Sequence, residues 1–282
     1  MKKCKSNIIV FIEIFNEIGR IESCLKNFIW ADELIVIDKN STDGTYEIAV
    51  KYATKVIRVP FSENSDEALK IIAEYKTEAE WALFPTASSL IHPELVSEII
   101  KLTTSIKFKY EVISLPYSFY AFGIESSDSP WGVKYKNILI KRSNLKLSNV
   151  VHNEIGFKKK SIFTIKNRRF KLLHCTHSSV GDFLEKVNRY GKRDAADEVK
   201  NLGYSRAINT SIKSLFKSIF LVLIVKRTIF YGRDGISLSL AYILYFMIKF
   251  IYVWDSKNKI EDDRYKVIKD KYNALWENLH EK

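Results

Sequence analysis

Two polar segments near the start of the chain carry side chains that could bind an oxygen-rich ligand. The first is Asn16-Glu17, and the second runs from Asp38 to Asp43 and Gly44; each follows a short apolar run. A carboxylate at a strand tip can accept hydrogen bonds from a base or a ribose hydroxyl, and a turn rich in hydroxyls at a helix start suits oxygen-rich ligands. A structural role is the alternative, because Ser, Thr and Asp also cap helices and Asp-Gly is a common turn.

These segments need a scaffold that brings them to one edge. Short runs of β-branched and aromatic residues alternate with longer segments in which apolar residues have helical spacing. Such alternation predicts a mostly parallel α/β sheet with helices on both faces, and ligands then bind at the carboxyl ends of the strands. The predicted strands are 8–14, 34–38, 56–59 and 81–84, and the predicted helices are 17–29, 45–53, 64–76 and 93–103.

The positive charge of the chain is concentrated in its second half. The formal net charge is +12, made up of −2 in residues 1–110, +14 in residues 111–254 and zero in residues 255–282. This distribution indicates one anion-facing surface rather than a uniformly basic protein. A nucleic acid is a poor candidate because no recognised nucleic-acid module is present, which leaves a diphosphate or phospholipid head groups.

The cysteines indicate a reducing compartment. There are three, Cys4, Cys24 and Cys175, widely spaced and without a CxxC pair that could hold zinc. A cytoplasmic location is therefore expected.

The order and spacing of several short motifs resemble the opening of family 2 glycosyltransferases. The motifs are Asn16-Glu17, Cys24-Leu25, the stretch 30–33, Ile37-Asp38 and the stretch 41–45. The similarity is greatest to the bacterial branch that adds sugars to lipopolysaccharide core or capsular glycans. The resemblance implies a GT-A fold, a nucleotide-sugar donor bound by Asp38 and Asp43, and Glu17 near the donor base.

One family motif is replaced. The motifs Trp81-Ala82 and His92-Pro93 flank the place where the family carries Asp-x-Asp, and here that place reads Thr86-Ala87-Ser88. Paired carboxylates hold a divalent cation on the donor diphosphate, whereas two hydroxyls supply no negative charge. Thr86 and Ser88 are therefore expected to line the donor site without a metal. Mg²⁺ or Mn²⁺ stays an open alternative as cofactor.

Two later residues are candidates for the chemistry. The stretch Val151-His152-Asn153-Glu154 resembles a Val-His-Glu element of the family with one residue inserted. In an inverting transferase a carboxylate deprotonates the acceptor hydroxyl, and Glu154 is the predicted base. His152 is a candidate phosphate contact. A structural ion pair for Glu154 and a hydrogen-bonded structural histidine are the alternatives.

Two further segments contain candidate contacts to the acceptor sugar or to a phosphate group. A helix is predicted over 180–201, and its Asn188-Arg189-Tyr190 resembles a tripeptide of the same glycosyltransferase branch, so that Arg189 is a candidate phosphate or acceptor contact. A solvated charged face is the alternative. The aromatic stretch 117–122, with Trp131 beyond it, could stack on sugar rings or could pack in a core.

The last third combines apolar, aromatic and basic residues. The uncharged runs 219–225 and 236–248 are each shorter than a membrane-spanning helix, and lysines and arginines flank them. This composition is typical of helices that lie in a membrane interface, and a buried helical hairpin or a dimer interface is the alternative.

Together these patterns predict a GT-A domain with a helical, membrane-associating tail. The expected parts are a nucleotide-sugar-binding half (1–110), an acceptor-side half (111–204) and a basic, aromatic tail (205–282). The expected reaction is sugar transfer from a nucleotide-diphosphate donor to a hydroxyl of a lipid-linked or cell-envelope glycan, at the inner face of an anionic membrane. A catalytically degenerate relative that acts in binding or assembly is the alternative.

Overall fold

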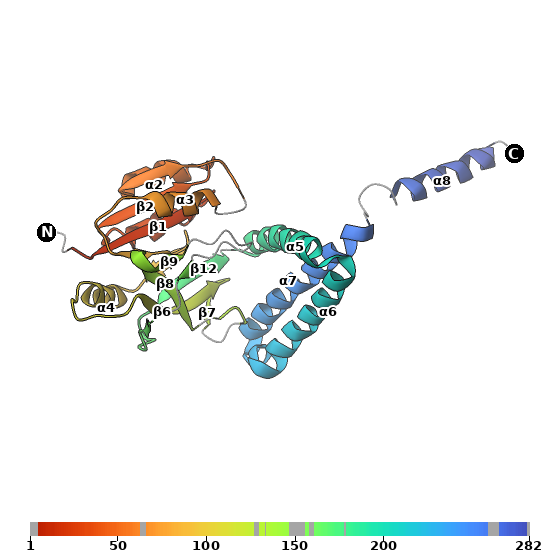
Figure 1. Ribbon diagram of the computed structural model, residues 1–282. Coiled ribbons are helices and arrows are strands. Elements are labelled where there is room, and N and C mark those ends of the chain that lie inside the picture. Colours follow the sequence, from red (N-terminus) through yellow and green to blue (C-terminus); the bar gives the residue numbers. More distant parts are fainter. Residues whose placement is uncertain are drawn as a thin grey trace. The chain divides into compact units, whose positions relative to one another are not determined.

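The computed structural model describes residues 5–62, 66–126, 130–132, 134–146, 156–157, 161–177, 179–258 and 265–280. The chain forms two compact units (Figure 1). The first comprises Met1–Ser127 and Gly132–Thr176, and the second comprises Asp128–Trp131 and His177–Lys282. The first unit contains the sheet, and the second is mainly helical.

The sheet of the first unit confirms the predicted α/β architecture. Four parallel strands lie in the order β3, β2, β1, β4; β8 follows antiparallel to β4, and β6 follows antiparallel to β8. The bounds of these strands are β1 Ile8–Ile14, β2 Glu33–Asp38, β3 Lys55–Arg58, β4 Trp81–Leu83, β6 Val112–Ala121 and β8 Tyr135–Lys141. The remaining strands of the ten-stranded sheet are β5 Ser89–Ile91, β7 Ile124–Ser126, β11 Ile162–Thr164 and β12 Leu172–His177, and a separate pair is formed by β9 Leu145–Lys146 and β10 Gly156–Phe157.

Helices cover both faces of the parallel strands (Figure 1). They are α1 Ile21–Lys26, α2 Thr45–Tyr52, α3 Asp66–Glu74 and α4 Pro93–Thr103. Successive residues of β1 point to opposite faces, so that Val10 packs in one apolar core with Leu25 and Leu95, whereas Phe11 packs in the other with Ile72. Burial on both sides explains why this strand is apolar from Ile8 to Ile12, whereas Glu13 near its end is only partly buried.

The strand order changes direction at β1. From β1 the chain moves outward to β2 and β3, and it then returns to place β4 on the other side of β1. In open α/β sheets, ligands bind beyond the carboxyl ends of the strands at such a point. The loop after β1 carries Glu17 and the loop after β4 carries Thr86, so the topology brings both predicted residues to this edge.

The second unit contains long helices. They are α5 Val180–Leu202, α6 Tyr204–Phe220, which continues as a π-helical turn over Leu221–Val225, α7 Gly232–Asn258 and α8 Tyr265–His280. The helices α6 and α7 pack side by side, and α7 also packs against α5 (Figure 1). At Gly191 of α5 an added Cβ would lie 2.9 Å from the side chain of Ile248 on α7, so this contact requires glycine.

The helical segments of this unit are longer than the uncharged runs suggested. Tyr204–Val225 and Gly232–Lys257 are each long and apolar enough to cross a membrane by length and composition, and only 17% of each most apolar window is buried. The uncharged runs are therefore parts of longer helices, whose length alone does not exclude spanning. The helices continue through Lys213, Lys217 and Lys249.

Candidate functional site

The loops that follow β1 and β2 are tied together by hydrogen bonds. The backbone N–H of Asn16 donates to Ser41 Oγ (3.0 Å), and the N–H of Thr42 donates to Asn16 Oδ1 (2.9 Å). The N–H of Glu17 donates to Thr45 Oγ1 (2.8 Å). Asn16 has φ +50°, a left-handed conformation that Asn tolerates better than most residues. The two polar segments therefore form one rigid edge.

Asp43 braces this edge. Its Oδ1 accepts hydrogen bonds from the N–H (3.0 Å) and hydroxyl (2.5 Å) of Thr45, and its Oδ2 accepts one from the N–H of Ile18 (3.1 Å). Burial acts to raise the pKa of Asp43, but the hydrogen bonds from Thr45 and Ile18 outweigh it and hold the pKa below its ordinary value. Asp43 was predicted to bind the nucleotide sugar, but both of its carboxylate oxygens accept hydrogen bonds from the loops themselves.

Asp38 is different, because one of its oxygens lacks an aligned donor. The residue ends β2 and is fully buried, and its Oδ1 accepts a hydrogen bond from the N–H of Ser41 (3.1 Å). Its Oδ2 lies 3.2 Å from Arg58 Nε, yet among the described residues no hydrogen bond reaches this oxygen. Arg58 itself is half exposed and lies over the ring of Tyr46 at 4.6 Å. A buried acceptor oxygen beneath a movable side chain is suited to receive an N–H or O–H from a ligand.

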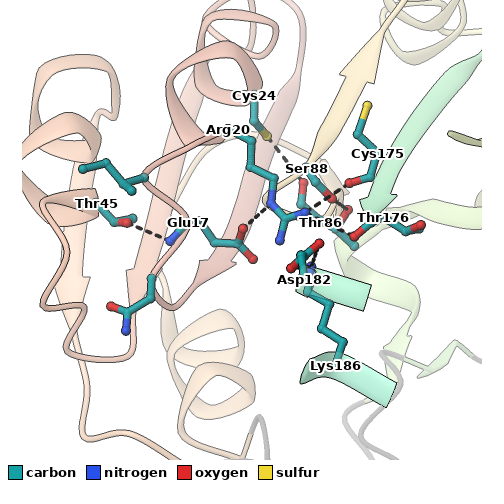
Figure 2. Close-up of polar contacts among 12 residues, drawn as sticks. Glu17, Arg20, Cys24, Thr45, Thr86, Ser88, Cys175, Thr176, Asp182 and Lys186 are labelled. Atoms are coloured by element: carbon teal, nitrogen blue, oxygen red, sulfur yellow. Dashed lines mark hydrogen bonds and ion pairs between the residues drawn. The ribbon is translucent and has the colours of Figure 1, made fainter. Parts of the chain in front are cut away.

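Glu17 is held by Arg20, a residue that the sequence analysis did not assign. Arg20 Nε donates to the Glu17 carboxylate, and Arg20 Nη1 donates to the carbonyls of Cys175 (3.3 Å) and Thr176 (3.2 Å). Figure 2 shows the Arg20 side chain reaching from the start of α1 to the end of β12. The ion pair is about four-fifths shielded from solvent, with 22% and 20% of the two side chains exposed. The orientation of the Glu17 carboxylate is therefore fixed by Arg20.

The Thr86–Ser88 segment forms a closed turn. Ser89 Oγ accepts from the N–H of Thr86 (3.0 Å) and lies 2.9 Å from Thr86 Oγ1. Burial raises the pKa of the Cys24 thiol to about 12, so the thiol stays protonated and donates to the carbonyl of Thr86 (3.4 Å). The N–H of Cys175 donates to the carbonyl of Ser88 (3.0 Å), which links this turn to the carbonyls that Arg20 binds (Figure 2).

This turn does not fit a divalent cation. Mg²⁺ and Mn²⁺ are hard ions that favour carboxylate oxygens, and the turn offers hydroxyls of which Ser88 and Ser89 are buried. Across the part of the chain that the structure describes, no three His, Cys, Asp or Glu side chains lie close enough together to hold a metal ion.

The cations at this edge are also paired with carboxylates. The pairs are Arg20 with Glu17, Lys39 with Glu13, and Arg58 with Asp38. Each pair removes most of the net charge that its cation would offer to an anion. The sequence analysis placed the excess positive charge in residues 111–254, and most of residues 147–160 in that range lie outside the described part of the chain.

The structure does not bring the other predicted site residues into this set of contacts. His152 and Glu154 fall outside the described residues. Arg189 lies in the second unit, on an exposed side of α5, with its guanidinium over the ring of Tyr190 at 5.2 Å. In the aromatic stretch 117–122, Tyr117 is buried and its hydroxyl lies 2.6 Å from His174 Nδ1, so core packing accounts for this ring.

Replacing Arg20 by alanine is expected to destabilise the first unit. The change removes donors from two carbonyls of β12 and leaves Glu17 without its partner, so we expect the free energy of unfolding to fall by about 1–3 kcal/mol. Urea denaturation measures it. The matched control is Lys26→Ala in α1, which breaks the exposed pair with Glu22 and should change stability far less. An equal loss in both variants would contradict the bracing role of Arg20.

The fold and the edge together define the class of protein. A parallel β3-β2-β1-β4 sheet continued by antiparallel strands, with an acidic edge at the change of direction, is a mixed α/β domain of the GT-A type. The chain belongs to glycosyl transferase family 2, whose model matches residues 9–164, more than half of its length. The predicted family is therefore confirmed, and the lipopolysaccharide or capsule branch stays a prediction.

Solved structures resemble parts of the chain. Glucosyl-3-phosphoglycerate synthase from Mycobacterium tuberculosis, in complex with Mn²⁺, UDP and glucosyl-3-phosphoglycerate, is 25% identical with a TM-score of 0.32. The same enzyme with Mn²⁺ and UDP-glucose is 23% identical with a TM-score of 0.33, and a mycobacterial protein is 20% identical with a TM-score of 0.35. The matches cover 39%, 39% and 48% of this chain and 43%, 43% and 53% of theirs. This chain thus spans about half the length of these proteins or less.

Proposed function

We propose that this protein transfers a sugar from a nucleotide-diphosphate donor to a hydroxyl of a lipid-linked or cell-envelope glycan, with inversion at the anomeric carbon and without a bound divalent cation. The observation that carries the proposal is the buried Oδ2 of Asp38, an acceptor oxygen without an aligned donor at the carboxyl edge of a family 2 sheet. The family resemblance assigns the nucleotide to this residue.

Donor binding would use the rigid edge. Asp38 Oδ2 would accept a hydrogen bond from the base or ribose once Arg58, which is half exposed, moves aside. Glu17, held by Arg20, lies at the neighbouring strand end, and Thr86 and Ser88 line the loop after β4. The bonds from Asp43 and Asn16 hold the two loops before the donor arrives, which lowers the ordering cost of binding.

The chemistry needs a base and a stabilised leaving group. We assign the base to Glu154, whose carboxylate would take the proton of the acceptor hydroxyl while that oxygen attacks the anomeric carbon. The bond from the anomeric carbon to the diphosphate oxygen breaks, and the nucleoside diphosphate leaves with the electron pair. The twelve basic residues in 134–171 supply cations that can stabilise this charge, with His152 and Arg189 as further phosphate contacts.

The acceptor follows from the helices of the second unit. Two segments, Tyr204–Val225 and Gly232–Lys257, have the length and composition of membrane helices. Basic residues accompany them, which favours an anionic membrane surface as partner and an acceptor anchored there. We place the protein at the cytoplasmic face of the membrane.

Metal removal tests the mechanism. With a panel of nucleotide sugars and a membrane glycolipid extract as acceptor, transfer measured in excess chelator should equal transfer measured with Mn²⁺. The reason is that the Thr86–Ser88 turn offers no carboxylate to the ion. Donor binding is measured in parallel by calorimetry.

Three other outcomes of this experiment would contradict the proposal in whole or in part. Transfer that chelator abolishes and Mn²⁺ restores would contradict the metal-free mechanism. Donor binding without transfer or hydrolysis, over the whole panel, would favour a degenerate protein that acts in binding or assembly. No binding of any nucleotide would overturn the proposed function.

A further inference from the structure

The helices α6 and α7 bury several small side chains together with a few larger ones. The small ones are Ala207, Ser211 and Ser218 on α6 and Ser239 and Ala241 on α7, and the larger ones are Val222, Leu238 and Val253; Ser211 Oγ donates to Glu198 of α5 (3.0 Å). Gly235 lies against the turn that joins the helices, where an added Cβ would be 2.0 Å from the carbonyl oxygen of Thr228. Small and weakly polar residues at a helix contact are characteristic of helices in lipid, where large apolar side chains need not hide from the solvent.

Large apolar side chains cover the outside of the same pair. On α6, Phe216 and Phe220 are 68% and 56% exposed. The exposed large apolar residues of α7 are Ile236, Leu240, Met247, Ile251 and Trp254. Their spacing of three, four or seven residues places them on one face along most of the helix. A water-soluble helix pair has the opposite arrangement, so this outer face calls for an apolar environment.

The opposite side of α7 faces polar groups of α5. Lys249 Nζ lies 2.9 Å from Glu198, and the hydroxyl of Tyr245 donates to Asp194. The hydroxyl of Tyr252 donates to Asn188 Oδ1 (2.5 Å). The helix α7 is thus apolar on its outer face and bonded to a charged helix on the other, along the same stretch of its length.

Positive charge accompanies the apolar surface. The basic residues of the pair and its connecting turn are Arg206, Lys213, Lys217, Lys226, Arg227, Arg233, Lys249 and Lys257, with Asp234 and Asp255 as the acidic residues among the same positions. Lys213 and Lys217 are one turn apart, exposed, and close to the middle of Tyr204–Val225. Lysines at the centre of a helix that crosses a bilayer are costly, whereas lysines at the level of lipid phosphates are favourable.

We propose that the α6–α7 hairpin lies in the plane of an anionic membrane, with the outer face of α7 in the acyl region and the lysines of α6 at the phosphates, and that it does not span the bilayer. Two observations favour the in-plane arrangement. The middle of α6 carries two lysines, and the middle of α7 is bonded to the charged helix α5. This inference deepens the membrane part of the proposed function and is tested without donor or acceptor, so its failure and that of sugar transfer are distinguishable.

Vesicle flotation of the full chain tests the surface. The probe is a vesicle of phosphatidylcholine with phosphatidylglycerol, and the variant is Leu240→Ser/Met247→Ser/Ile251→Ser. We expect the fraction bound to fall about tenfold or more, because three side chains lose their apolar contacts. Binding of the natural chain should also weaken as salt rises or as phosphatidylglycerol is omitted.

The matched control makes the same kind of change on α8. Val267, Ile268 and Leu275 are 65%, 54% and 54% exposed, and their replacement by serine should leave flotation within about twofold of the natural chain. Loss of binding in the α8 variant alone would overturn the proposal. So would a dimer in light scattering that the α7 variant dissociates, since the face would then cover a second copy. Circular dichroism confirms folding of each variant.

The depth of α7 in the bilayer distinguishes a helix that lies in the membrane plane from one that spans the membrane. A fluorophore is attached to a single cysteine at position 236, 247 or 251, in a chain with Cys4 and Cys175 changed to serine; Cys24 is fully buried. Lipids brominated at different depths should quench all three positions equally, at one shallow depth in the acyl region. Deep quenching at 247 with shallow quenching at 236 would show a spanning helix and overturn the in-plane arrangement.

Discussion

Asp38→Asn is expected to weaken nucleotide binding by about 10- to 100-fold while the protein stays folded. The change removes the negative charge and turns one oxygen into an N–H donor. If that donor replaces Oδ2, it faces both Arg58 Nε, 3.2 Å away, and the N–H of the bound nucleotide. The oxygen that accepts from the N–H of Ser41 can be kept, so the turn after β2 is retained. Calorimetry with nucleoside diphosphates measures the affinity.

The control is an aspartate at the opposite edge of the sheet. Asp32 precedes β2, and its oxygens accept hydrogen bonds from the backbone N–H of Ser6 and Asn7, each at 2.8 Å. Asp32→Asn should lower the free energy of unfolding by about 1–2 kcal/mol and leave nucleotide affinity unchanged. If Asp38→Asn binds nucleotide as well as the natural chain does, the donor does not use this oxygen and the site must be sought elsewhere.

Glu154→Gln is expected to reduce sugar transfer by about 10²- to 10⁴-fold without weakening donor binding. Glutamine keeps the size of the side chain but cannot accept the proton of the acceptor hydroxyl. Transfer is measured with saturating donor, and affinity is measured separately, so that a catalytic loss is distinguished from a binding loss.

A second glutamate serves as the reference. Glu125 forms an ion pair with Lys171 in the same unit, and Glu125→Gln should leave transfer within about twofold because this pair is partly exposed. Full transfer by the Glu154 variant would exclude it as the base. An equal loss in both variants would indicate a general effect on the fold rather than proton transfer.

The parallel strands of the core were predictable because buried strand positions are mostly occupied by apolar residues. The runs 8–14 and 34–38 are strands in the structure, shifted by one residue at most, since both faces of β1 and β2 are covered and nearly every position in these runs is apolar, with Glu13 and Asp38 near their ends as the polar ones. The same pattern places Asp38 at the end of β2, where it is observed. Family membership then followed from short motifs along these strands.

Helix lengths were less predictable where polar bonds intervene. The predicted helix 17–29 is reduced to Ile21–Lys26, because the N–H groups of Glu17 and Ile18 donate to Thr45 and Asp43 in the next loop. The spacing of apolar residues in 17–29 does not show that these two N–H groups bond to another loop instead of to helix carbonyls. In the second unit the helices are longer than the uncharged runs in the sequence, because they continue through charged residues.

The roles of individual polar residues depended on distant partners. Asp38 and Asp43 are both carboxylates at the same loop, and the sequence does not distinguish them. In the structure, Asp38 has a buried oxygen without an aligned hydrogen-bond donor, whereas both oxygens of Asp43 accept hydrogen bonds from the loops. Arg20 lies three residues after Glu17, a spacing that hints at an ion pair, but its carbonyl partners are more than 150 residues away in sequence. Such long-range contacts are absent from the pattern of any one segment.

The closed turn at Thr86 also couples charge to fold. Its hydroxyl and N–H both bond to the buried Ser89, and the neighbouring Cys24 thiol donates to the Thr86 carbonyl. An aspartate at position 86 would still accept a hydrogen bond from the Ser89 hydroxyl, but it would place a negative charge beside buried neutral groups. A bound cation would stabilise that charge, so an acidic residue here would make the stability of the turn depend on cation binding.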